Sequence, residues 1–175
     1  GVADDSFEQA MGELTRYRRM IRRPNKDDEE LPVIFNDYMN CLFGDPTTAK
    51  ELPLIDAAAA CGCEYYVIDA GWYAPGEWWD SVGEWKECRD RFPNGIKEVT
   101  DCIRKKGMVP GVWLELEVMG INCEKAKKAP DDWFFVRHGK RVYDRSRYQL
   151  DFRNPAVIEH VNEVIDRVVK EYGVG

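Results

Sequence analysis

The stretch Tyr65-Tyr66-Val67-Ile68-Asp69-Ala70-Gly71-Trp72 decides the fold. Its first four residues are apolar without a polar break, which predicts a strand buried on both faces, as strands of parallel sheets are. Asp69 then stands where the strand leaves the core. In a β/α barrel this carboxyl end of a strand is where ligands bind. Taken alone, a cap on the following turn is an equal alternative for Asp69, so the rest of the chain has to decide.

The segments on either side of this strand alternate between helix and strand patterns. The expected elements are an amphipathic helix at 4–21, a polar linker at 22–30, a strand at 33–35, a helix at 53–61, the strand at 65–68, a helix at 95–106, a strand at 109–117, a hairpin at 133–143 around His138-Gly139, an extended piece at 148–151 and a helix from Pro155 to just before Gly173. A long loop rich in Trp occupies 73–92, and loops of this length inside compact domains are usually functional.

This order predicts an α/β fold with a parallel sheet. Residues 31–175 are expected to form the first three β/α units of a TIM-type barrel, and residues 1–30 a preceding helix and linker. The loops after the second and third strands are much longer than those before them, which favours a site at the carboxyl ends of the strands.

Composition excludes several classes of function. The 175 residues carry a net charge of −7, which argues against nucleic acid as a partner. The arginines between 16 and 23 are expected on a helix surface or in pairs with nearby acids. No signal peptide or membrane-spanning apolar run occurs, so no membrane partner is expected. The six cysteines form no C-x-x-C pair, and we expect no metal, no cofactor and a reduced, cytoplasmic setting.

The three expected strand ends bring carboxylates and aromatic rings to one mouth. These residues are Asp37, Tyr38, Asp69, Trp72, Trp113, Glu115 and Glu117. The combination indicates a carbohydrate, because sugar hydroxyls bind carboxylates and the sugar C–H face packs on flat rings. No glycine-rich phosphate loop and no Gly-x-Ser-x-Gly elbow is present, which argues against a phosphate ligand and a serine hydrolase.

Each of these assignments has a structural alternative. On the expected strand, Glu115 and Glu117 share a face, and a salt bridge for one of them competes with ligand binding. Trp79 and Trp85 could simply cover the rim of the barrel. His138, in its hairpin turn, is expected to be structural or solvated.

Several blocks, in one order, carry a resemblance to a known family. They are Asp69-Ala70-Gly71-Trp72-Tyr73, Gly83-Glu84-Trp85, Arg91-Phe92-Pro93-Asn94-Gly95, Lys106-Gly107-Met108, Gly111-Val112-Trp113-Leu114-Glu115, and Leu150-Asp151 with Asn154-Pro155. Together they resemble glycoside hydrolase family 36, the α-galactosidases and α-N-acetylgalactosaminidases, over about residues 31 to 175.

This resemblance implies a (β/α)8 barrel that hydrolyses terminal α-linked galactose-type sugars with retention, using two carboxylates about 5 Å apart. It implies that Asp69 accepts hydrogen bonds from galactose hydroxyls and that Trp113 helps to wall the pocket, while Tyr38 stands where the family often has Trp. Ala70 replaces a second Asp that is common in the family. Neither Asp69 nor Glu115 matches a catalytic carboxylate.

The resemblance also places the chemistry outside this chain. The family's nucleophile lies at the end of the fourth strand, in a Lys-x-Asp signature that we expect just beyond Gly175, and the acid/base follows later. We therefore expect no catalytic residue within the chain and no activity from it alone. A partial barrel leaves parallel edges unpaired, so self-association or pairing with the remainder of the barrel is expected.

Two alternatives remain open at this point, a sugar-binding module without chemistry and a purely structural half-barrel. Titration with galactose, compared with an Asp69→Ala variant, separates them. The sequence leaves open galactose versus N-acetylgalactosamine, and the linkage preference.

Overall fold

The computed structural model describes residues 6–175. The chain divides into two compact units, Gly1–Pro32 and Val33–Gly175. In the first unit, helix α1 spans Phe7–Ile21 and is capped by Ser6, whose side chain accepts the N–H of Gln9 at 3.2 Å. The predicted helix is confirmed from Phe7 onward, and its expected first residues, 4 and 5, lie outside the described part.

Within the expected polar linker the structure has a second short helix, α2 (Lys26–Glu30), which the sequence analysis does not predict. Asn25 caps α2 by accepting the N–H of Asp28 at 3.0 Å. Acidic residues fill the first turn of α2, where their negative charge interacts favourably with the positive end of the helix dipole.

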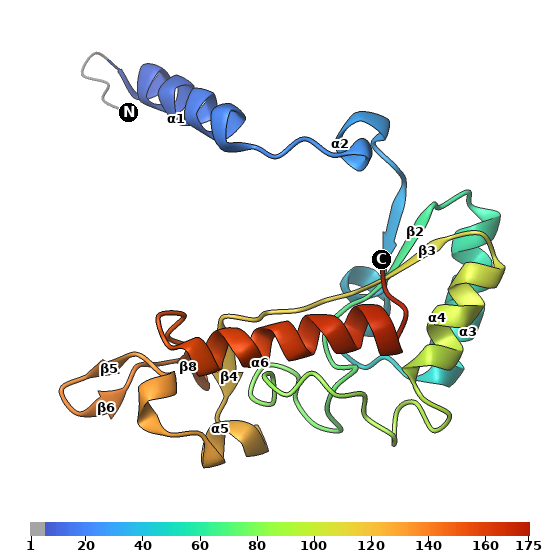
Figure 1. Ribbon diagram of the computed structural model, residues 1–175. Helices are drawn as coiled ribbons and strands as arrows, with labels where there is room; N and C mark the ends of the chain where they lie inside the picture. Colours follow the sequence, from blue (N-terminus) through green and yellow to red (C-terminus); the bar gives the residue numbers. More distant parts are fainter. Residues whose placement is uncertain (1–5) are drawn as a thin grey trace. The chain divides into compact units, whose positions relative to one another are not determined.

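The second unit contains the parallel sheet that the sequence predicts. Strands β1 (Ile34–Asn36), β2 (Tyr65–Ile68) and β3 (Val109–Val112) pair in parallel in the order β1-β2-β3 (Figure 1). Alternate residues of β2 are buried and half-buried, so only one of its faces is fully covered. The described sheet has three strands and does not close into a barrel.

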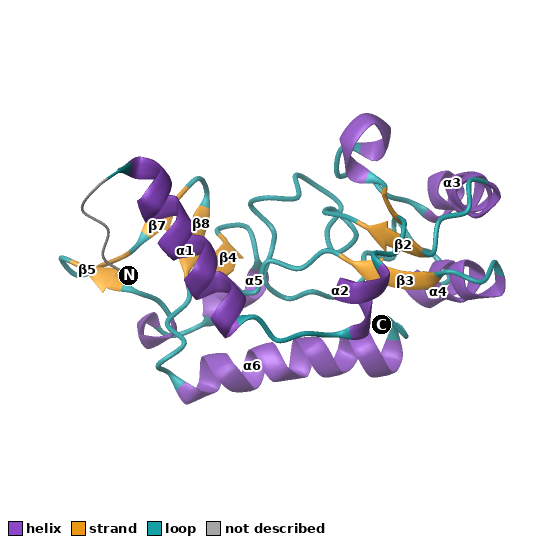
Figure 2. Cartoon of the chain, turned by 90° about the horizontal axis from the view of Figure 1, so that it is seen from above, coloured by secondary structure: helices purple, strands orange, loops and turns teal. Residues whose placement is uncertain are grey.

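Two helices, α3 (Thr48–Ala60) and α4 (Ile96–Lys105), lie side by side next to this sheet (Figures 1 and 2). The sequence predicts α4 closely, but it places the start of α3 too late. Thr47 caps α3 by accepting the N–H of Lys50 at 3.3 Å. Pro53 removes one helical hydrogen bond yet does not end the helix, which is why the prediction from Pro53 fails.

Beyond β3 the structure departs from the sequence prediction. Residues 113–117 are not strand, so the shared strand face of Glu115 and Glu117 is wrong. Instead, a short antiparallel sheet forms in the order β4-β8-β7. Its strands are β4 (Val118–Gly120), β7 (Tyr143–Asp144) and β8 (Arg147–Gln149).

The second unit has several further small elements, of which the first, η1, directly follows β1. They are the π-helical turn η1 (Tyr38–Leu42), helix α5 (Glu124–Lys128), the 3-10 turn η2 (Asp131–Trp133), and the hairpin β5 (Val136–Arg137) and β6 (Lys140–Arg141). The hairpin turns at His138-Gly139, as the sequence predicts.

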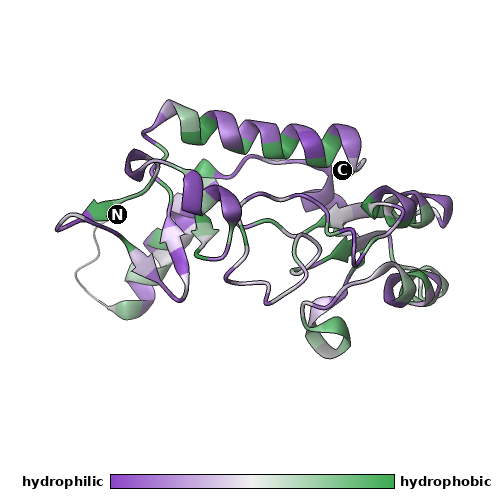
Figure 3. Cartoon of the chain, turned by 90° about the horizontal axis from the view of Figure 1, so that it is seen from below, coloured by the Kyte–Doolittle hydropathy of each residue, from purple (hydrophilic) through white to green (hydrophobic). Residues whose placement is uncertain are grey.

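The last helix, α6 (Pro155–Asp166), continues into a π-helical turn, η3 (Arg167–Glu171). Asn154 caps α6, because its side-chain oxygen accepts the N–H of Ala156 at 2.9 Å. In both views α6 runs from the antiparallel sheet towards the parallel one (Figures 1 and 2). Apolar and polar residues alternate along it (Figure 3). Its valines are buried, while Ile158 and Ile165 are exposed.

The long loop between β2 and α4 is part of the core. Its fully buried side chains include Trp72, Val82, Trp85 and Phe92, and they pack with residues of α3, α4 and η3. Across the part of the chain that the structure describes, no helix is both long and apolar enough to cross a bilayer.

Candidate functional site at the strand ends

The carboxyl ends of β1, β2 and β3 lie at one edge of the parallel sheet, and Asp69 is held there by three hydrogen bonds. Its Oδ2 accepts the side-chain amide of Asn36 at 2.6 Å, and its Oδ1 accepts the N–H of Ala70 at 2.6 Å. Its own N–H donates to Asp37 Oδ1 at 2.7 Å. Asp69 is half-buried. A carboxylate has about four acceptor positions, so this one is fixed and still has capacity for a hydroxyl donor.

Two of the predicted site residues lie behind this edge. Asp37 is 1% exposed and its accepting oxygen faces the backbone of Asp69. Trp72 is fully buried, and its indole N–H donates to the backbone carbonyl of Trp113 at 3.1 Å. Both therefore support residues closer to the surface.

Trp113 and Tyr38 meet the same indole, that of Trp78. The Trp78 and Trp113 rings cross nearly at right angles, with centroids 5.3 Å apart, and Trp78 Nε1 donates to the Tyr38 hydroxyl at 3.2 Å. Tyr38 and Trp113 are each half-buried. The three rings form an aromatic wall beside the strand ends. Trp85 is buried behind Trp113, with a centroid distance of 5.7 Å.

Glu115 forms a salt bridge with Arg147, which was one of the alternatives open from the sequence. The exposed fractions are 24% for the Glu115 side chain and 17% for that of Arg147. Because Arg147 belongs to β8, the antiparallel sheet supplies a residue to the site formed by the parallel one.

A pocket of about 300 Å³ lies next to this salt bridge. It is lined by Trp78, Trp79, Arg145, Ser146 and Arg147. Trp79 is 40% exposed, and Arg145 is exposed as well. The pocket therefore offers an accessible indole and guanidinium donors, and it shares Trp78 with the aromatic wall.

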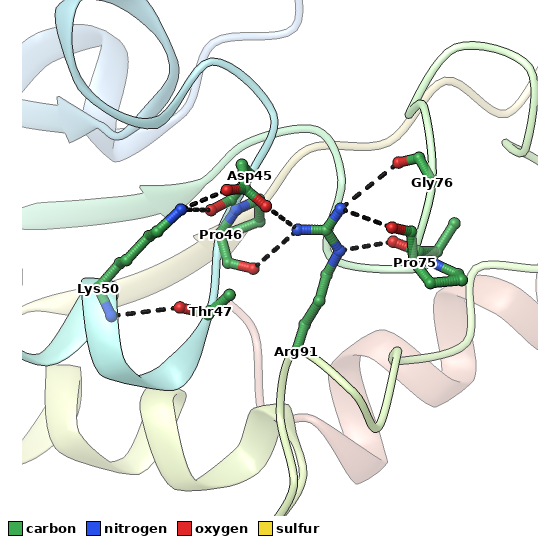
Figure 4. A network of polar contacts seen from close by, with 8 residues as sticks. Asp45, Pro46, Thr47, Lys50, Pro75, Gly76 and Arg91 are labelled. Atoms are coloured by element: carbon green, nitrogen blue, oxygen red, sulfur yellow. Dashed lines mark hydrogen bonds and ion pairs between the residues drawn. The ribbon is translucent and has the colours of Figure 1, made fainter.

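Arg91 fastens the start of the long loop to the segment before α3 (Figure 4). Its guanidinium donates to the carbonyl of Ala74 at 2.6 Å and to those of Pro75 and Gly76 at 3.4 Å. On the other side it pairs with Asp45, which also binds Lys50. The Arg91 side chain is nearly buried, so these contacts fix the start of the loop.

Sequence reasoning missed five residues that shape the site. They are Asn36, Glu51, Tyr66, Trp78 and Arg147. Only Glu51 carried a usable signal, because it lies four residues before Ile55 and seven before Ala58, on the face of α3 that is buried. An acidic residue on such a face is unusual and requires a partner.

The Melibiase family profile matches residues 5–175 of the chain. Among individual proteins, α-galactosidase 1 of Pediococcus pentosaceus is 28% identical over 167 residues, which are 95% of this chain and 22% of that protein. The α-galactosidase AgaA of Geobacillus stearothermophilus is 30% identical over 156 residues, which are 87% of this chain and 21% of AgaA.

Solved structures align in the same way. A variant of the G. stearothermophilus family 36 enzyme AgaA in complex with stachyose aligns with a TM-score of 0.77 and 28% identity, over 90% of this chain and 22% of that one. A second AgaA variant in complex with raffinose aligns with a TM-score of 0.78 and 26% identity. The chain thus spans about a fifth of the length of the relatives that it matches.

Proposed function

Since the chain belongs to the Melibiase family, the family 36 α-galactosidases, we propose that it forms part of the sugar pocket of a retaining α-galactosidase. The substrate class is an oligosaccharide with a terminal α-linked galactose-type sugar. The observation that carries the proposal is the fixed, half-buried carboxylate of Asp69 beside an aromatic wall. Carboxylates accept sugar hydroxyls, and rings pack against sugar C–H faces.

Each predicted residue takes a role that follows from its burial. Asp69 accepts galactose hydroxyls, and Tyr38 and Trp113 line the pocket. Glu115 acts together with Arg147, whose side chain it holds. Asp37 and Trp72 are buried and support Asp69 and Trp113 from behind.

The pocket beside Trp79 receives the rest of the oligosaccharide in this proposal. Its volume of about 300 Å³ suits one further sugar ring. The exposed indole is a stacking surface for that ring, and Arg145 donates hydrogen bonds to its hydroxyl oxygens. Two variants of the relative AgaA have solved structures in complex with stachyose and with raffinose, which are oligosaccharides of more than one ring. Trp79→Ala is therefore expected to weaken binding of raffinose more than binding of galactose.

The nucleophile and the acid/base lie outside these 175 residues in this proposal, and the chain alone binds but does not hydrolyse. Calorimetric titration with galactose tests the binding, with Asp69→Ala as the variant that loses it and Asp144→Ala, an exposed residue of β7, as the matched control. An aryl α-galactoside tests the chemistry. Turnover by the purified chain contradicts the assignment of the catalytic pair, and equal galactose affinity in wild type and Asp69→Ala contradicts the binding role.

We also propose that the chain associates with itself through its parallel sheet. Within the described residues, β1 pairs with β2 alone, and the outer edge of β3 accepts one backbone hydrogen bond, from the N–H of Gly175 to the carbonyl of Pro110 at 3.1 Å. Both edges are otherwise open, and open edges attract further strands. Light scattering at micromolar concentration is expected to give a mass well above the 20.3 kDa of one chain. A mass equal to that of one chain across the concentration range contradicts this proposal.

A further inference from the structure

Two acidic side chains meet in the interior beneath Asp69. Asp37, which follows β1, is 1% exposed, and Glu51, in the first turns of α3, is 0% exposed. Their carboxyl groups are close enough to hydrogen-bond each other. Two carboxylates at such a distance that are both buried from solvent cannot both remain charged.

Each carboxyl group has one oxygen with a fixed donor. The Tyr66 hydroxyl donates to Glu51 Oε2 at 2.6 Å, and the N–H of Asp69 donates to Asp37 Oδ1 at 2.7 Å. The two remaining oxygens, Asp37 Oδ2 and Glu51 Oε1, are buried and have no donor among the described residues. A single proton between these two oxygens satisfies both of them.

The surroundings decide which residue carries that proton. Burial, followed by the neighbouring Asp37, raises the pKa of Glu51 to about 9. Burial also raises the pKa of Asp37, but its carboxylate accepts a backbone N–H, which favours the charged form. The pKa of Tyr66 is raised by burial and by Glu51, so its hydroxyl stays a donor. Asp37 and Cys41 raise the pKa of Tyr66 further.

We propose that Glu51 is protonated and donates from Oε1 to Asp37 Oδ2, and that this acid pair is a positioning device which holds the backbone of Asp69. The resulting series of hydrogen bonds runs from the Tyr66 hydroxyl through Glu51 and Asp37 to the N–H of Asp69. Removing the proton from Glu51 places a second negative charge beside Asp37 and breaks the hydrogen bond between the two acids, in the middle of this series. The consequence for sugar binding rests on the proposed function, whereas the shared proton and its effect on the Asp69 backbone do not.

Carboxyl carbon-13 and amide nitrogen-15 NMR of the 175-residue chain test the proposal. The Glu51 carboxyl is expected to remain protonated from pH 5 to pH 8 and to titrate near pH 9, and the Asp69 amide is expected to shift in the same step. Glu51→Gln keeps a permanent donor towards Asp37, so in that variant the Asp69 amide is expected to lose this step. A Glu51 carboxyl that titrates below pH 6, or an Asp69 amide that shows no step near pH 9 in wild type, overturns the proposal.

Galactose binding provides a second readout. Wild-type affinity is expected to fall about tenfold between pH 7 and pH 10, which corresponds to about 1.4 kcal/mol. Glu51→Gln is expected to bind like wild type at pH 7 without that fall, whereas Glu51→Leu, which removes the donor, binds about tenfold more weakly already at pH 7. Equal pH dependence in wild type and Glu51→Gln contradicts the positioning role. Absence of binding in all variants contradicts the proposed function, while the NMR titration still decides the acid pair.

Discussion

The indole Nε1 of Trp72 donates a 3.1 Å hydrogen bond to the backbone carbonyl of Trp113, and so joins the chain just after β2 to the chain just after β3. Trp72 is fully buried against Trp85 and Tyr172. Trp72→Phe keeps an aromatic ring but removes the donor and leaves a gap. We expect the free energy of unfolding to fall by about 2 to 4 kcal/mol, from the unpaired carbonyl and the lost packing.

Urea denaturation measures this change. Trp79→Phe is the matched control because Trp79 is 40% exposed, and a surface substitution is expected to change stability by less than about 0.5 kcal/mol. If Trp72→Phe is as stable as this control, the hydrogen bond to Trp113 does not contribute to folding.

Arg91 gives a second prediction, since a lysine cannot replace its fork of donors. Arg91 binds carbonyls on one side and Asp45 on the other, and its side chain is 9% exposed. Arg91→Lys preserves the charge but reaches only part of these acceptors, so we expect a loss of about 2 to 4 kcal/mol.

The control for Arg91 is Arg89→Lys. Arg89 also pairs with an acid, Glu87, but its side chain is 66% exposed, and exposed pairs contribute at most about 1 kcal/mol. Thermal unfolding of both variants separates the roles. Similar melting temperatures for Arg91→Lys and wild type are incompatible with the anchoring of the loop.

The parallel sheet, its two flanking helices and the position of Asp69 could be predicted from the sequence, because local patterns determine them. The run before Asp69 is continuously apolar, and Gly95 and Gly107 flank α4. The blocks that resemble family 36 establish the order of these elements along the chain.

The second sheet could not be predicted, because its strands are only two or three residues long and pair across the sequence. Gly120 of β4 shows why. A Cβ at this position would lie 2.0 Å from the carbonyl oxygen of Asp80, so close approach of two distant backbones determines the residue. The pairing of Asp37 with Glu51 could not be predicted for a similar reason, because the two residues are separated along the chain. Asp37 itself is among the predicted site residues, but the sequence does not show that Glu51 is its neighbour.

Gly71 and Gly107 separate two effects of adding a Cβ to a glycine, namely backbone strain and a clash with a neighbouring backbone. Both have positive φ, +102° and +83°, but a Cβ at Gly71 would lie 2.1 Å from the carbonyl oxygen of Gly44, whereas one at Gly107 meets nothing within 4 Å. Gly107→Ala is expected to cost about 1 to 2 kcal/mol from the backbone conformation alone. Gly71→Ala adds a backbone clash, and we expect more than about 4 kcal/mol.

Denaturant titration of the two alanine variants tests this difference. Gly71 follows Asp69 by two residues, so its variant is also expected to lose galactose binding where any folded protein remains. Equal destabilisation of the two variants contradicts the close approach of Gly71 to Gly44.

His160 predicts how stability depends on pH. It is 4% exposed, its Nε2 lies 2.9 Å from the carbonyl oxygen of Gly83, and its Nδ1 lies 2.8 Å from Lys125 Nζ. A carbonyl only accepts and an ammonium only donates, so the ring is neutral with its proton on Nε2. Burial, followed by the charge of Lys125, lowers the pKa of His160, with Arg167 acting in the same direction and Glu163 opposing it.

The sign follows from proton uptake. In the unfolded chain this histidine binds a proton near its ordinary pKa of about 6.5, while in the folded chain it does so only at lower pH. The stability contributed by the neutral ring is therefore complete above about pH 6.5 and falls as the pH drops from there towards the folded pKa, by at most about 1.4 kcal/mol per pH unit.

His160→Gln, which retains one donor and one acceptor, is expected to lack this component. Unfolding free energies measured from pH 5 to pH 8 test it, with His138→Asn, at the exposed hairpin turn, expected to keep the wild-type slope. A slope below pH 6.5 that is unchanged in His160→Gln shows that other groups produce the pH dependence.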